Sequence, residues 1–80
     1  MPEEHEMLAT CTSGQETADV LARALDGQGI AFTRHTITVQ VGDRDVTLHE
    51  IAVAMAHRQF VIDLLRESQQ INAAISARPA

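Results

Sequence analysis

The stretch from residue 43 to residue 78 contains neither glycine nor proline, and this feature most restricts how the chain can fold. Near its start, Thr47 is followed three residues later by Glu50, which is the spacing of a helix capping box. We therefore expect one helix over 48–77. At 1.5 Å per residue it would be roughly 45 Å long, whereas a compact domain of this size is about 30 Å across. The helix must overhang the domain, break, or be covered by a second molecule.

The predicted helix changes character along its length. Residues 51–56 are apolar on all sides and need to be covered from several directions. The second half is amphipathic, and its apolar stripe is the surface we expect a protein partner or a second copy to contact. The predicted partner-binding residues are Phe60, Val61, Leu64, Ile71 and Ile75.

A shorter helix is predicted over 14–26. Ser13 and Glu16 have capping-box spacing, and the apolar residues of 18–25 recur at helical intervals. Gly27 and Gly29 would end the helix, because glycine tolerates the left-handed conformation of a helix C-terminus. Residues 5–12 precede it as a possible first strand.

The segment 30–41 is rich in β-branched residues and is predicted to be extended. Ile37, Val39 and Val41 share one face, while Ile30 and Phe32 lie in the opposite phase. A bulge or break near 34–35 would be needed to bring both sets onto one core face. The turn-forming cluster 42–45 predicts a short hairpin partner at 46–48.

These elements predict a single α+β domain over 1–80, in the order β-α-β-β-α, with a small antiparallel or mixed sheet packed on a short helix and a long C-terminal helix. Residues 1–6 would be an acidic flexible start and residues 78–80 a frayed tail. No segment has the apolar length of a signal peptide or a membrane span. We expect a cytoplasmic protein that does not associate with membranes.

The charge balance bears on the choice of partner. The formal net charge is −5, and all six cations are arginine. Nucleic-acid binding normally depends on a concentrated positive patch, so this balance disfavours it. An acidic protein can instead occlude a basic surface, for example on a nucleic-acid-handling protein, and we keep this inhibitor role as one alternative.

A second alternative is a helix-turn-helix over 48–67. The segment resembles that motif because apolar or small residues stand at its required positions, although the turn would carry Ala56 and His57 where glycine and an apolar residue are usual. DNA-contacting residues would be Arg58, Gln59 and Arg66, which acidic neighbours accompany. The matching positions are Ile51, Ala52, Met55, Ile62 and Leu65.

The remaining candidates for chemistry are few. His49 and His57 are eight residues apart, about 12 Å on a helix, too far to share one metal ion. Cys11 precedes a predicted helix, where the dipole could lower a thiol pKa, but no second cysteine or glycine-rich phosphate loop accompanies it. We predict no metal, no cofactor, no small-molecule substrate and no enzymatic activity. The expected function is that of a small regulatory or adaptor protein, acting through protein–protein binding and self-associating as a homodimer.

Overall fold

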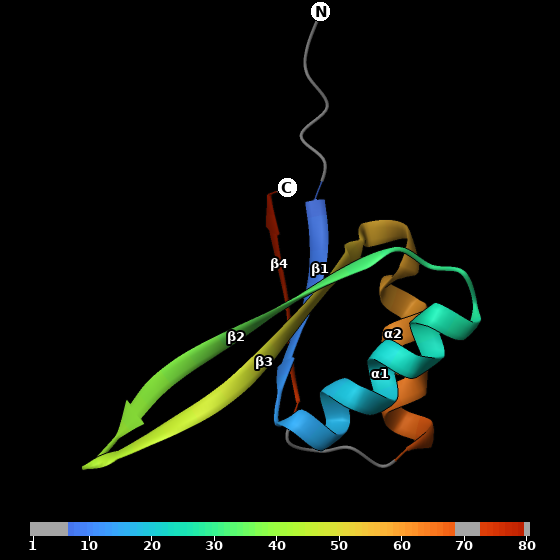
Figure 1. Ribbon diagram of the computed structural model, residues 1–80. Coiled ribbons are helices and arrows are strands. Elements are labelled where there is room, and N and C mark those ends of the chain that lie inside the picture. Colours follow the sequence, from blue (N-terminus) through green and yellow to red (C-terminus); the bar gives the residue numbers. More distant parts are fainter. Residues whose placement is uncertain (1–6, 69–72, 80) are drawn as a thin grey trace, which may run out of the picture.

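The computed structural model describes residues 7–68 and 73–79. Along the chain, seven elements follow one another in the order β-α-β-β-α-β, with one 3-10 turn, η1, before the second helix (Figure 1). They are β1 (Met7–Ser13), α1 (Gln15–Gly27), β2 (Phe32–Val41), β3 (Arg44–Ala54), η1 (Met55–His57), α2 (Arg58–Glu67) and β4 (Ala74–Pro79).

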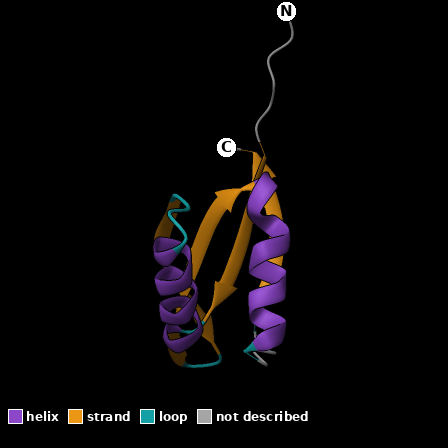
Figure 2. Ribbon diagram, turned by 90° about the vertical axis from the view of Figure 1, so that its right-hand side faces the viewer, coloured by secondary structure: helices purple, strands orange, loops and turns teal. Residues whose placement is uncertain are grey.

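The four strands form one sheet in the order β2-β3-β1-β4, and every neighbouring pair is antiparallel. Both helices lie on the same side of this sheet (Figure 2). Two β-α-β units interlocked in this way form a ferredoxin-like fold. In the part of the chain that the structure describes, no helix covers the second face of the sheet.

The core lies between the helices and the sheet. Leu21 and Leu25 of α1 are fully buried against Ile51 of β3, and α2 adds Val61 and Leu65. The periodicity that predicted a helix over 14–26 is thus confirmed by α1. Its start differs from the prediction: Ser13 ends β1, Gly14 is the N-cap, and no side chain caps the helix.

The predicted long C-terminal helix is wrong, and with it the order β-α-β-β-α. Residues 48–54 belong to β3, residues 55–57 form η1, and only 58–67 are α-helical. A fourth strand follows, and the longest helix among the described residues is α1, with 13 residues. Thr47 and Glu50 are strand residues and form no capping box.

The physical reason lies in the position of β3 inside the sheet. Ile51, Ala52 and Val53 are all buried, because β3 has a strand on each side and the core against one face. A short apolar run of this kind cannot be distinguished from a buried helix by periodicity alone.

The hairpin of β2 and β3 is longer than predicted and has no bulge. The register runs unbroken from Phe32 opposite Val53 to Val41 opposite Arg44. The expected break near 34–35 is therefore absent, and the two apolar phases of β2 remain on opposite faces. Gly42 begins the two-residue turn with φ +67°, a conformation that glycine adopts readily.

Two further predictions concern the chain ends. Arg78 and Pro79, expected in a frayed tail, pair with Leu8 and Met7 as the end of β4. The predicted acidic start at 1–6 lies outside the described residues. Within the described part of the chain, neither helix has the length and apolar character required to cross a bilayer.

Candidate functional site

The strand register assigns each sheet residue to one of two faces. Cys11, its β3 partner Ile51 and its β4 partner Ile75 face the helices and belong to the core or pack against it. Side chains alternate between the two faces along a strand. Residues an odd number of positions away from Cys11, Ile51 or Ile75 on the same strand therefore face away from the helices. We call this second, helix-free side the open face.

Beyond the end of β1, the open face continues onto a two-stranded ribbon. The last residue of β1, Ser13, pairs with His49, and from there β2 and β3 extend as a hairpin without a third strand. Figure 1 shows this ribbon projecting past both helices. The described structure measures 49 × 29 × 17 Å, an elongated and thin shape for so few residues.

Five aliphatic side chains gather on the open face of this ribbon. The cross-strand pairs Ile37–Leu48 and Val39–Val46 lie there, followed by Val41 opposite Arg44. Val41 is 60% exposed, and Ile37 and Val46 are more than a third exposed. We call these residues the ribbon strip: Ile37, Val39, Val41, Val46 and Leu48.

The opposite face of the ribbon is polar. Thr36, Thr38 and Gln40 of β2 face Thr47 and Asp45 on β3, or His49 nearer the domain. The ribbon is therefore amphipathic, and its polar face lies on the helix side. Cross-strand aliphatic pairs stabilise a hairpin by roughly 0.2–1 kcal/mol each, and here part of their surface still contacts water.

Sequence analysis did not identify the ribbon strip as a site. The shared face of Ile37, Val39 and Val41 was predicted, and the register confirms it. Assigning that face to the core was wrong, because both helices pack on the other side. The alternation of polar Thr36, Thr38 and Gln40 with apolar residues could not show on which face of the sheet the helices would pack.

Nearer the domain centre, the open face carries charge. Glu50 of β3 and Arg78 of β4 form an ion pair across the intervening strand β1. The distance between Oε1 of Glu50 and Nη2 of Arg78 is 3.5 Å. His35 lies opposite Glu50 on β2. Such a partly exposed pair contributes little stability, but it gives the open face a polar centre between apolar ends.

The far end of the open face is apolar again. Leu8 of β1 and Ala54, the last residue of β3, lie on the open face and, with Met7 and Met55, line an open hollow of about 300 Å³. Met7 is 41% exposed. Flexible methionine side chains adapt to irregular surfaces, so this end also offers contact area to a partner.

The predicted partner-binding residues do not form one exposed stripe. Val61 is buried in the core, and Phe60 and Leu64 are half-buried against it. Ile75 is a residue of β4 rather than of a helix, and it also packs against the core. Ile71 lies outside the described residues.

The predicted DNA-contacting residues all lie on α2. Arg58, Gln59 and Arg66 are exposed, and Gln59 donates a hydrogen bond to Asp63 at 2.9 Å. However, residues 48–54, which would form the first helix of a helix-turn-helix, are strand β3. The segment 48–67 therefore lacks the pair of helices that the motif requires.

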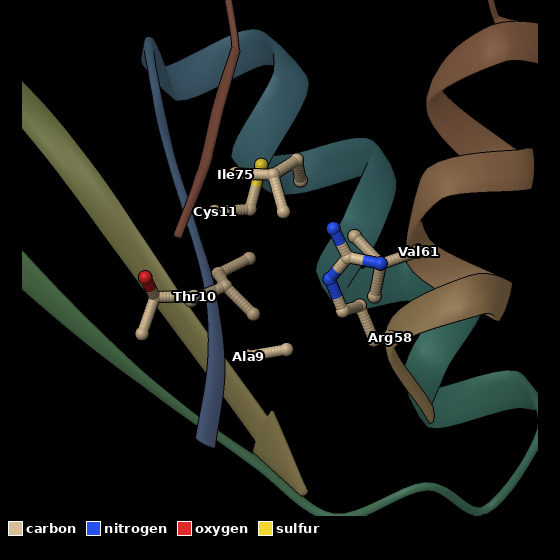
Figure 3. A pocket seen from close by; sticks show the side chains of 7 residues that line it. Ala9, Thr10, Cys11, Arg58, Val61 and Ile75 are labelled. Atoms are coloured by element: carbon tan, nitrogen blue, oxygen red, sulfur yellow. The ribbon is translucent and has the colours of Figure 1, made fainter. Parts of the chain in front are cut away.

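Cys11 lies between the sheet and α2 (Figure 3). Its side chain is 1% exposed, and a narrow apolar gap lined by Ala9, Ile51, Val61 and Ile75 adjoins it. Figure 3 shows Arg58 at this gap, whereas Thr10 points to the other side of β1. Burial raises the pKa of the Cys11 thiol from 9.0 to about 11, the opposite of the direction that an activated nucleophile requires.

Metal ligands are not clustered in the part of the chain that the structure describes: no three histidine, cysteine or acidic side chains there could hold one ion together. His49 and His57 lie on β3 and η1 rather than on one helix.

Comparison with solved structures shows that the fold is shared. A functionally unknown protein from Pediococcus pentosaceus ATCC 25745 has a TM-score of 0.63 at 13% identity, over 98% of this chain and 94% of that one. A DUF3240 family protein from Shewanella baltica OS155 has a TM-score of 0.60 at 13% identity, over 98% and 92%. CutA from Synechococcus elongatus PCC7942 has a TM-score of 0.56 at 13% identity, over 99% and 80%. No protein-family model matches the sequence, and no curated protein is significantly similar to it. At this identity the likeness shows the fold alone.

Proposed function

We propose that the chain is a non-enzymatic protein-binding module that self-associates, with a second copy covering the open face of its sheet. The observation that carries this proposal is the ribbon strip. Its aliphatic side chains share one face of a projecting hairpin, and neither α1 nor α2 lies over that face. Contiguous exposed apolar surface on a small protein usually marks an interaction site.

The geometry favours a second copy over a small ligand. An open sheet face is nearly flat, whereas small-molecule sites are concave and enclose most of the ligand. A broad flat face suits another protein surface, and most oligomers of soluble proteins are assembled from identical chains.

The area of the sheet supports an interface that covers the whole open face rather than the ribbon strip alone. Beyond β1 the ribbon adds five residues of each strand, which at ~3.3 Å per residue and ~4.8 Å between strands gives roughly 160 Å². The four rows that span all four strands and the two that span three strands add roughly 350 Å². A standard interface buries about 800 Å² of accessible surface per partner. The ribbon strip alone is too small, whereas the complete open face, at roughly 510 Å² in projection, supplies more than half of that area.

The absence of enzymatic activity is part of the same proposal. The titratable side chains of the described residues are distributed over the open face, the polar ribbon face, α1 and α2, and the buried thiol of Cys11 has a raised pKa. General acid–base chemistry requires such groups to converge in a cleft, and the open face offers apolar contact area instead.

The experiment compares two adjacent positions on β3. Val46→Glu places a charge on the ribbon strip, and Thr47→Glu places the same charge on the polar face of the same strand; both residues are exposed. Sedimentation velocity should show that Val46→Glu lowers the oligomer population at a concentration where Thr47→Glu does not. Equal sedimentation of both variants and the unmodified protein would refute an interface at the ribbon strip.

Circular dichroism of both variants provides the control for folding. Because both positions are exposed in the protomer, neither substitution creates a cavity or buries a charge, and each should retain the helix and strand content of the parent.

A further inference from the structure

Three side chains from three elements join the base of the ribbon to α1. Arg34 of β2 lies on the helix side of the sheet, and its Nη2 is 2.9 Å from Oδ1 of Asp19 on α1. The same guanidinium donates toward His49 of β3, with Nε at 3.4 Å and Nη2 at 3.3 Å from Nδ1. Arg34 therefore links a helix carboxylate to a strand imidazole.

The identity of the accepting atom fixes the charge of the imidazole. A guanidinium has only N–H donors and keeps its charge at all ordinary pH values. Two of its donors converge on Nδ1 of His49, so that nitrogen must carry a lone pair. The ring proton is then on Nε2, and the imidazole is neutral in this arrangement.

Among the described residues, one cation contacts the ring, and no carboxylate forms a hydrogen bond or ion pair with it. From β2 the cation is Arg34, and from α1 the carboxylate of Asp19 contacts Arg34 rather than the ring. From β1 the residue opposite His49 is Ser13, which is uncharged and donates its hydroxyl to the Gly14 carbonyl.

Two other acidic groups lie near in the sequence or the fold. Glu50 follows His49 on β3, but alternation places it on the open face, where it pairs with Arg78. Glu16 is in the first turn of α1 and is exposed. A proton added to Nδ1 of His49 would thus face the Arg34 guanidinium directly.

We infer that His49 is a pH-sensitive joint between the ribbon and α1: protonation of Nδ1 breaks its contact with Arg34 and leaves Arg34 held by Asp19 alone. An imidazolium and a guanidinium cannot share a hydrogen bond, because both are donors. Strand β3 then loses its side-chain connection to the helix layer, whereas β2 keeps the ion pair of Arg34 with Asp19. This inference does not depend on self-association, because all three groups belong to one protomer.

Nuclear magnetic resonance of the ¹⁵N-labelled full chain tests the joint. At a pH of about 8, the imidazole of His49 should be the Nε2–H tautomer. As the pH is lowered to about 5, the Arg34 Nε–H resonance should shift, and its exchange with water should accelerate, with the same midpoint as the protonation of His49.

Matched variants identify the group responsible. His49→Gln should abolish the pH response of Arg34 over this range, whereas His35→Gln, one residue along β2 from Arg34 but on the open face, should leave it unchanged. An Nδ1–H tautomer at pH ~8, or an Arg34 resonance that does not follow the His49 titration, would overturn the inference. Sedimentation of the same samples reports separately on self-association, so failure of one proposal is distinguishable from failure of the other.

Discussion

The alkaline stability of this protein should be controlled by Cys11. Its thiol is 1% exposed, and burial raises its pKa from 9.0 to about 11. Each pKa unit corresponds to 1.36 kcal/mol, so the difference between the folded and unfolded states amounts to about 3 kcal/mol. A domain of this size is expected to have a total unfolding free energy of about 4–12 kcal/mol, so the loss is large enough to measure.

The direction follows from the order in which the two states release the proton. Below pH 9 the thiol is protonated in both states, and the contribution of burial is fully present. Between about pH 9 and pH 11 the unfolded state releases the proton while the folded state retains it. The free energy of unfolding should therefore fall across this interval and level off above it.

The composition leaves few other groups that could change the unfolding free energy at alkaline pH. The sequence has no tyrosine and no lysine, and arginine remains charged in this range. Cys11 is thus the only side chain expected to titrate between about pH 9 and pH 11.

Urea unfolding followed by circular dichroism, with a reductant present, measures the effect at intervals from about pH 8 to about pH 11.5. The matched control is Cys11→Ala, which removes the thiol and should make the unfolding free energy nearly independent of pH there. Parallel pH profiles for the two proteins would refute the assignment of a raised thiol pKa.

Two further predictions concern the fold. Leu25→Ala should lower the unfolding free energy by about 2–5 kcal/mol, because Leu25 is fully buried. Val20→Ala, on the exposed side of α1, should change it by about 0.5 kcal/mol or less. Equal midpoints of the two variants in urea unfolding would contradict the assigned core. Gly42→Ala should cost about 1–2 kcal/mol, because Gly42 has φ +67°. Gly27→Ala, at the end of α1 without a positive φ and with open space for a Cβ, should be nearly neutral. Thermal unfolding of both glycine variants measures this difference, and similar melting temperatures would contradict the turn conformation.

Local signals in the sequence predicted the elements that depend on local interactions. The apolar repeat of 18–25 with glycines after it predicted α1, and the turn cluster 42–45 predicted the β2–β3 hairpin. In both cases the structure is determined by residues that are neighbours in the sequence.

Elements that depend on distant partners were mispredicted. Ile51, Ala52 and Val53 form a strand because β1 and β2 flank them, and Ala74–Pro79 form a strand because β1 offers its other edge. Nothing within 48–79 alone distinguishes these runs from a helix. The long helix, and the exposed stripe assigned to it, followed from this ambiguity.

The candidate site was missed for a related reason. Alternation showed that Ile37, Val39 and Val41 share a face, but the side on which the helices pack is a property of the whole fold. With two helices on one side, these residues become the surface of a projecting ribbon. A better prediction would have required the sheet topology.

The most direct test of self-association through the open face is the solution mass of the unmodified chain over a concentration series. Light scattering should be combined with refractive-index detection, because the chain has no tryptophan or tyrosine. Self-association predicts a mass that rises with concentration to a whole-number multiple of 8.7 kDa. A mass of 8.7 kDa at every concentration would contradict it, because the open face would then remain in contact with water.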